Sequence, residues 1–254
     1  MRITLLGTGT SQGVPIIGCN CKVCTSEDPR DQRLRTAALV EVDDQNILID
    51  AGPDLRQQLL RSHTTTLRAL LLTHEHKDHT AGLDDVRPIN FLMKQSLNIY
   101  GMARVLKVIR KDYDYAFNTY KYPGVPELIL NPIHSDQSFW IDEVEIVPIK
   151  VHHMTLPILG YRIRNLAYIT DASMIGEKEK EKLFDLDLLV VNALRIEEHY
   201  SHFNLAQALA LIKEVQPRKA MITHIGHEMG LYEEVSKLLP SNVMLGYDGL
   251  TMDL

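Results

Sequence analysis

The chain has little cysteine and no long apolar run. Only three of its 254 residues are cysteine, and so small and odd a number argues against a disulfide framework. No segment approaches the roughly 18 uninterrupted apolar residues of a membrane-spanning helix, so we expect no membrane partner. The opening stretch has one basic residue and a short apolar run that ends at Gly7, which favours a buried strand over an export signal. We therefore expect a cytoplasmic protein.

Positive charge is also scarce. The chain has 27 Lys and Arg against 33 Asp and Glu, a formal net charge of −6, which argues against a broad electrostatic grip on nucleic acid. A small anionic substrate would need a metal or local arginines. Apolar residues make up 45% of the chain, enough for a substantial core. With no linker or low-complexity tract visible, we predict a single α/β domain over residues 1–254, a four-layer αββα sandwich.

Hydrophobic periodicity and turn residues predict the order of elements. The first half is predicted to hold strands at 2–6, 37–42, 46–50, 69–72 and 97–101, with helices at 53–62, 84–95 and 102–112. The second half is predicted to hold strands at 143–150, 159–164, 166–170, 187–191 and 219–223, with helices at 204–214 and 228–238. Residues 113–126 read as irregular. Residues 102–140 match no motif, and substrate choice could reside there.

Ligand-type side chains are concentrated at the end of the predicted strand 69–72. The sequence continues as THEHKDH, which places His74, His76, Asp78 and His79 within six positions. Alternate residues of an extended loop point the same way, so His74 and His76 can bind one cation. Asp78 and His79 can face a second cation as the chain turns into a helix. The alternative is a solvated polar loop.

Further ligand-type residues follow later predicted strands. His152 and His153 come after one strand, Asp171 after another, and His224 after a third. Open α/β sheets usually build their sites at such strand ends. A carboxylate such as Asp171 can bridge two cations in a two-metal site, although each of these residues alone could be a capping or core polar residue.

The whole pattern resembles the metallo-β-lactamase-fold superfamily of hydrolases. Its HxHxDH signature stands here at His74–His79, and the segments GTGTSQGVP, LIDAG, HIGH and GYDG extend the likeness over nearly the full length. The resemblance implies two active-site cations (Zn, Mn or Fe). It assigns His74, His76 and His153 to one metal, Asp78, His79 and His224 to the other, and Asp171 to a bridging position. His153 is preferred to His152 because HMTLPILGYRI resembles the family segment that carries this ligand.

All three cysteines lie in the stretch GCNCKVC, at Cys19, Cys21 and Cys24. This stretch resembles the cysteine insert of the PhnP-type phosphoribosyl cyclic phosphodiesterases, in which a histidine three residues after the last active-site histidine completes a structural zinc site. His227 stands at that position. The resemblance thus implies a zinc-binding loop at about 18–24. The alternative is a set of reduced, buried thiols, against which the polar neighbours Asn20 and Lys22 argue.

His202 precedes the predicted helix 204–214, where Asn204 can serve as N-cap. A histidine at this place in the PhnP-like group is the proposed general acid, and His202 matches it better than His199. We therefore predict His202 and Asp78 as catalytic residues; the alternative for His202 is a helix-start histidine bonded to backbone. Arg56, Arg87 and Arg195 could contact phosphate or could simply be solvated.

The resemblance implies a dinuclear phosphodiesterase that hydrolyses a small phosphodiester, such as a cyclic ribose phosphate, to a monoester. It also implies a homodimer. Other hydrolases on the same metals stay open as alternatives, among them a tRNA 3′-processing nuclease, a thioesterase and a lactamase. A non-catalytic member that binds a metabolite is a further alternative.

Overall fold

The computed structural model describes residues 1–120 and 122–254. Its first sheet contains seven strands, and its helices are α1 (Leu55–Arg61), α2 (Lys77–Thr80), α3 (Arg87–Met93) and α4 (Ala103–Asp112). The strands, in the order in which they pair, are β15 (Thr251–Asp253), β1 (Arg2–Gly7), β2 (Ala37–Val42), β3 (Gln45–Ile49), β4 (Ala69–Leu71), β5 (Leu97–Met102) and β6 (Leu128–Ile133).

The second sheet contains eight strands, and three helices alternate with its later strands. In pairing order the strands are β11 (Met174–Ile175), β8 (Val144–His153), β9 (Leu156–Ile163), β10 (Leu166–Ile169), β12 (Leu188–Asn192), β13 (Lys219–Thr223) and β14 (Val243–Leu245), with β7 (Phe139–Ile141) paired to β8. The helices are α5 (Glu177–Lys180), α6 (Leu205–Val215) and α7 (Tyr232–Ser236). Short 3-10 turns lie at Pro29–Asp31, Leu83–Val86, Asp114–Ala116, Glu181–Leu183 and His227–Met229.

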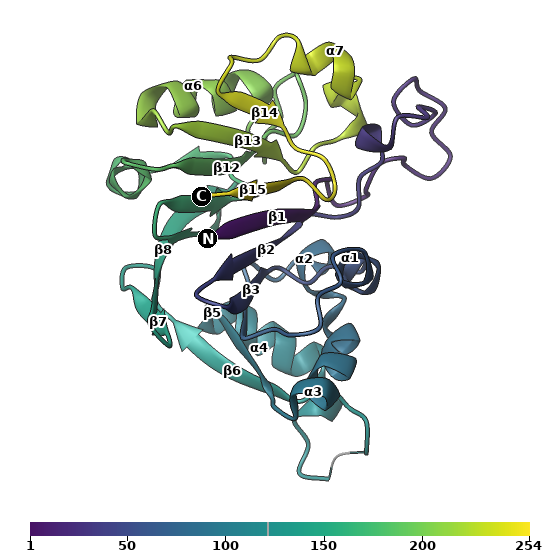
Figure 1. Cartoon of the computed structure of the whole chain (residues 1–254), viewed down its shortest axis with the longest axis vertical. Coiled ribbons are helices and arrows are strands. Elements are labelled where there is room, and N and C mark those ends of the chain that lie inside the picture. The colour runs from purple at the N-terminus through teal and green to yellow at the C-terminus, as the bar shows by residue number, and fades with distance from the viewer. Residues whose placement is uncertain (121) are drawn as a thin grey trace.

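Three apolar clusters hold these layers together. One joins the two sheets and includes Ile3 and Ile49 from the first and Tyr161 and Val190 from the second. The two others pack the outer face of each sheet against its helices. Because side chains alternate along a strand, each sheet can feed two cores at once. Figure 1 shows the resulting layers, with α6 and α7 on one side and α1–α4 on the other, and the predicted αββα sandwich is confirmed.

Two runs of parallel strands position the functional residues. The strands β3, β4, β5 and β6 pair in parallel, as do β10, β12, β13 and β14. Parallel strands bring their carboxyl ends to one edge of a sheet. His74, Asp171 and His224 follow closely on the ends of β4, β10 and β13. The ligand-type residues noted in the sequence therefore lie near one another, at the carboxyl ends of these parallel strands.

The expected element boundaries differ from the structure in several places. His152 and His153, which were expected to follow a strand, are the last two residues of β8. The predicted helix 228–238 is divided into the 3-10 turn His227–Met229 and α7, because Gly230 adopts φ +103°, which no helix continues. The predicted helix 84–95 begins as the 3-10 turn Leu83–Val86 and becomes α3 at Arg87, where Pro88 fits the first turn. The strands β6 and β7, within or next to the stretch that matched no motif, were not predicted.

Candidate metal centres

A cluster of buried histidines and carboxylates lies where the two sheets present their strand ends. His79 Nε2 is 3.1 Å from Asp78 Oδ2 and 3.3 Å from Asp171 Oδ2. His224 Nδ1 is 3.1 Å from the same Asp171 oxygen. His74 Nε2 is 3.0 Å from His76 Nδ1. Segments separated by more than half of the chain thus meet at one centre.

Asp171 lies at the middle of this centre. Among the described residues, four groups of side chains have ligand atoms within 4.8 Å of one another, and Asp171 belongs to three of them: with His74 and His79, with His153 and His202, and with Asp78 and His224. Asp171 and His224 both adopt left-handed backbone conformations, with φ of 59° and 55°. Non-glycine residues are uncommon there, and such strain collects at functional sites.

Neighbouring groups orient the histidine rings. His79 Nδ1 donates to Asp50 Oδ2 at 2.7 Å, and His74 Nδ1 donates at 3.0 Å to Thr73 Oγ1. Because the Thr73 hydroxyl itself donates to Asp50 at 2.8 Å, its oxygen is left to accept from His74. Each ring therefore turns its Nε2 toward the centre as a lone pair, the arrangement of a metal-binding histidine with a carboxylate behind it. Asp50 was not predicted as a site residue.

The structure distinguishes between the two candidate histidines of β8. His153 Nδ1 donates to the carbonyl oxygen of Ser201 at 2.8 Å, and its ring lies 5.3 Å from that of His76. No group of ligand atoms in the described part of the chain includes His152. Successive residues of a strand point to opposite faces, so His153 turns toward the centre and His152 away from it. This placement agrees with the preference for His153, whose role as a ligand stays a prediction.

The electrostatics of the centre suit a cation. Burial opposes protonation of His79, but the carboxylates of Asp171, Asp50 and Asp78 hold its pKa well above the ordinary value. Burial likewise raises the pKa of Asp171, yet His224 and His79 hold it well below the usual range. Within the described chain, His79 Nε2 is buried without a hydrogen-bond partner. The raised pKa means that a positive charge between His79 Nε2 and the two carboxylates is favoured. A cation bound to the Nε2 lone pair would supply that charge in place of the proton, so the residues fit a metal.

The three cysteines converge on His227. Its Nδ1 lies 3.4 Å from the sulfur of Cys19, 3.3 Å from that of Cys21 and 3.5 Å from that of Cys24. Tetrahedral zinc bonds of ~2.3 Å to sulfur and ~2.05 Å to nitrogen would place these atoms about 3.6 Å apart. The amide of Cys24 lowers the pKa of the Cys21 thiol to about 6, which favours the thiolate that a metal binds. The set fits one closed structural zinc site.

One loop connects the two centres. His224 belongs to the buried cluster and His227 to the cysteine cluster, and only Ile225 and Gly226 separate them. Thr10, on the way from β1 to the cysteines, hydrogen-bonds through Oγ1 with His224 Nε2 at 3.3 Å. Its amide donates to the carbonyl of Ile225 at 3.1 Å. Loosening the cysteine loop would therefore disturb the position of His224.

His202 lines a pocket of about 490 Å³ beside the buried cluster. Asn204 caps α6, as predicted, and forms a capping box with Gln207. The His202 ring stacks on His224 at 4.8 Å, and its Nδ1, 3.8 Å from Asp171 Oδ1, has no hydrogen-bond partner among the described residues. Burial and the neighbouring His224 lower the pKa of His202 to about 3. Its imidazole is therefore neutral at neutral pH in the absence of substrate.

The candidate arginines do not join the cluster. Arg195 lines the pocket, but its guanidinium is held by Glu228 at 2.7 Å and by the carbonyl of Glu198 at 2.8 Å. Arg56 is exposed on α1, and Arg87 Nε donates to the carbonyl of Asp84 at 2.9 Å. Arg195 is therefore paired with a carboxylate, and neither Arg56 nor Arg87 is among the described residues that line the pocket at His202.

Two tyrosines of the stretch without a motif support the histidine loop. The hydroxyl of Tyr113 donates to the carbonyl of Thr80 at 2.9 Å, and that of Tyr115 donates to Asp84 at 2.6 Å. Tyr120 and Tyr122 are exposed. None of these four tyrosines lines the pocket at His202. Tyr113 and Tyr115 therefore stabilise the segment that follows His79.

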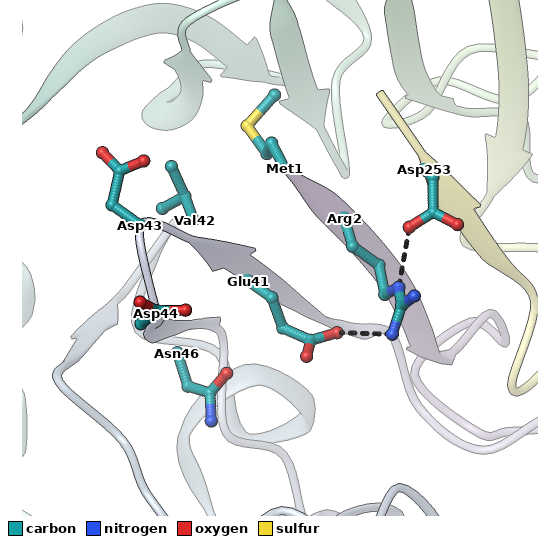
Figure 2. Close-up of a pocket in the computed structure, with 8 residues that line it drawn as sticks. All are labelled: Met1, Arg2, Glu41, Val42, Asp43, Asp44, Asn46 and Asp253. Carbon is teal, nitrogen blue, oxygen red and sulfur yellow. Dashed lines mark hydrogen bonds and ion pairs between the residues drawn. The ribbon is translucent and has the colours of Figure 1, made fainter.

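A second cavity of similar size lies at the opposite end of the first sheet, around the β2–β3 turn (Figure 2). Its carboxylates include Glu41 and Asp253, which pair with Arg2 at 4.0 and 2.8 Å. No histidine or cysteine is among the described residues that line it. We therefore assign it no chemistry.

Replacing Asp50 with asparagine is expected to weaken active-site metal binding by about 10- to 100-fold, the usual effect of removing a partner behind a ligand. Asp50 orients His79 directly and His74 through Thr73. Asparagine keeps the shape and tolerates the left-handed φ of 63°. The measurement is a competitive metal titration, with the exposed Asp136→Asn as control. An unchanged affinity in the Asp50 variant would contradict the orienting role.

Replacing Cys21 with serine is expected to remove one zinc per chain and to lower the melting temperature. Structural zinc contributes ~10–16 kcal/mol in zinc-finger peptides, and losing only about 3 kcal/mol would lower Tm by about 6–12 °C in a chain of this size. Lys22→Ser is the control, because Lys22 lies in the same loop with an exposed side chain. Elemental analysis and calorimetry measure both effects; full zinc content in the Cys21 variant would refute the site.

Comparisons with known proteins agree with this geometry. The family described as Beta-lactamase superfamily domain matches residues 45–225. The crystal structure of a new diphosphatase from the PhnP family superposes with a TM-score of 0.92 and 35% identity, covering 99% of this chain and 97% of the other. The fold and the site therefore define a hydrolase class that depends on metal. The chain belongs to the β-lactamase superfamily and, within it, to the PhnP family, as its sequence resemblance implied.

Two further relatives carry other names. An octanoyltransferase from Porphyromonas gingivalis is 42% identical over 252 residues, 98% of this chain but 51% of that protein. A coenzyme PQQ synthesis protein B from Rhodopseudomonas palustris is 31% identical over 152 residues, 55% of this chain and 46% of that protein. The chain thus spans about half the length of these curated relatives. In the part of the chain that is described, no helix has the length and apolar character needed to cross a membrane.

Proposed function

We propose that the chain is a dinuclear metal-dependent phosphodiesterase that hydrolyses a small phosphodiester to a monoester. The observation that carries this proposal is the shared position of Asp171 in three groups of ligand atoms. The pocket at His202 would give a substrate access to this centre, because His202 Nδ1 lies 3.8 Å from Asp171 Oδ1. A carboxylate shared by two sets of histidines is the arrangement expected of a two-metal hydrolase.

Each residue has a proposed role. His74, His76 and His153 would hold one cation and Asp78, His79 and His224 the other, with Asp171 between them. When bound, the cations would supply positive charge to the phosphate oxygens and acidify an attacking water. Their identity, Zn, Mn or Fe, depends on availability as much as on this donor set. Asp50 and the Ser201 carbonyl would keep the rings of His79 and His153 in the binding tautomer.

His202 would deliver a proton to the leaving oxygen. Without substrate its low pKa keeps the ring neutral. An anionic phosphate in the pocket would place negative charge against the ring and raise that pKa toward neutrality, because an opposite charge nearby favours the protonated form. The unpartnered Nδ1 and the stacking on His224 leave the ring free of competing backbone hydrogen bonds. Substrate binding would thus favour protonation of His202 beside the leaving oxygen that receives the proton.

The PhnP-family diphosphatase supports phosphorus chemistry, since it shares this fold over nearly its full length. A cyclic ribose phosphate remains one candidate substrate. A homodimer and a single domain over the whole chain also remain proposals. A second candidate function, hydrolysis of an acyl thioester, is favoured by one observation: the relative that matches 98% of this chain is named octanoyltransferase.

The test compares two substrates on the same metal-loaded protein, bis(p-nitrophenyl) phosphate and octanoyl coenzyme A. We expect turnover of the phosphodiester, stimulated by Zn or Mn, and little or none of the thioester. The reverse result would establish the thioesterase alternative. Turnover of neither, with metals bound, would leave a non-catalytic binding protein on a hydrolase fold.

A further inference from the structure

Five aromatic rings form a continuous column from the buried cluster to the surface. The His79 ring stacks on His224 at 5.8 Å and 10° between planes, and His224 stacks on His202 at 4.8 Å and 22°. The column continues to His199 at 5.5 Å and 31°, and ends at Tyr200, 4.5 Å from His199 with 29° between planes. The two inner rings, His79 and His224, are predicted metal ligands, whereas Tyr200 has no part in the predicted metal site.

Tyr200 presents most of its ring to solvent. One side packs on His199, yet 75% of the residue is exposed. It lines the same pocket as His202. A large aromatic ring left open at the mouth of a catalytic pocket is a surface on which a planar group can stack. The ring of Tyr200, at the outer end of the column, is therefore open for a ligand to stack on it.

The charges around the pocket at His202 limit the kind of ligand group that it can bind. Arg195 is neutralised by Glu228 at 2.7 Å, and no lysine is among the described residues that line the pocket. The remaining wall includes the exposed Ser11 and Gln12, which offer hydroxyl and amide groups. A second phosphate would find no free cation here. A neutral planar ring with polar edges finds both a stacking face and hydrogen-bonding groups.

We propose that Tyr200 is a stacking platform for the heterocyclic base of a nucleotide-type substrate. This inference rests on the proposed function, since the phosphate is taken to lie beside Asp171 and His202. Ring steps of 5.5 and 4.5 Å separate His202 from Tyr200, and an extended nucleoside monophosphate, from its phosphate to the outer edge of its base, can reach across both. Tyr200 would thus select nucleoside phosphates over ribose phosphates that lack a base.

The experiment measures binding of two monoesters to the metal-loaded protein by titration calorimetry. Adenosine 5′-monophosphate and ribose 5-phosphate share the phosphate and the sugar and differ in the base. We expect the wild type to bind the nucleotide about tenfold more tightly, the size of one base–aromatic stack. Tyr200→Ala should reduce this ratio to about twofold or less, and Tyr200→Phe should keep it, because phenylalanine retains the stacking ring.

The affinity for ribose 5-phosphate should be the same in all three proteins, which shows that Tyr200→Ala leaves the phosphate site intact. Equal affinities for the two ligands in the wild type would overturn the inference, as would an unchanged preference in Tyr200→Ala. Turnover of bis(p-nitrophenyl) phosphate is measured on the same samples. Turnover without a preference for the nucleotide would contradict only the stacking role of Tyr200. A preference for the nucleotide without turnover would contradict only the proposed hydrolysis.

Discussion

Replacing Asp171 with asparagine is expected to lower hydrolysis of bis(p-nitrophenyl) phosphate by more than about 100-fold. Removing a residue that only orients a metal ligand usually lowers metal affinity or activity by ~10–100-fold. Asp171 is itself a predicted ligand and lies 3.3 Å from His79 and 3.1 Å from His224, so its loss should cost more. Asparagine would offer an uncharged amide oxygen in place of the carboxylate and would hold either predicted cation less tightly. Asparagine is preferred to alanine because the residue has φ 59°, which asparagine tolerates.

The matched control for this variant is Asp185→Asn. Asp185 also adopts a left-handed conformation, with φ 58°, but is exposed. The same chemical change should therefore leave activity and metal content near the wild-type values. If Asp171→Asn retained more than about one tenth of the activity with full metal content, Asp171 would not be the bridging ligand.

Replacing His202 with alanine is expected to reduce turnover by about 10²–10⁴-fold when the leaving group is a poor one. Adenosine 2′,3′-cyclic phosphate is such a substrate, because its departing alkoxide needs a proton. Nitrophenolate leaves without one, so bis(p-nitrophenyl) phosphate should lose much less activity in the same variant. The comparison of the two substrates separates proton delivery from general damage to the pocket.

Equal losses on both substrates would contradict the role of general acid and leave His202 as a residue that positions substrate. Metal content serves as the control, since His202 stacks on the predicted ligand His224. A His202→Ala protein that lost its metals would show that the ring supports the centre rather than the leaving group.

The residues that sequence could identify are those whose companions lie nearby along the chain. His74, His76, Asp78 and His79 announce a metal site because ligand-type residues at this spacing are rare in a solvated loop. Asp50 gave no such signal, because a single aspartate after a strand has no local companion. Its role arises from the parallel pairing of β3 with β4, which brings Asp50 beside Thr73.

Sequence alone also left the choice between His152 and His153 to a family likeness. Alternation along β8 says that the two rings point to opposite faces, but only the tertiary position of the Ser201 carbonyl shows which ring is oriented toward the cluster. The division of the predicted helix 228–238 at Gly230 is similar, because a lone glycine inside a helical pattern is usually tolerated. The ring column likewise joins three distant segments of the chain and could not be read from any one of them.

The metal content of the purified wild-type protein, measured by mass spectrometry alongside phosphodiester hydrolysis, decides whether the chain is a dinuclear metal-dependent hydrolase. We expect about three metal ions per chain, one held by the cysteines and two around Asp171, with diesterase activity that falls when the latter two are removed by a chelator. One metal or none per chain after incubation with Zn or Mn, and no turnover, would contradict this assignment.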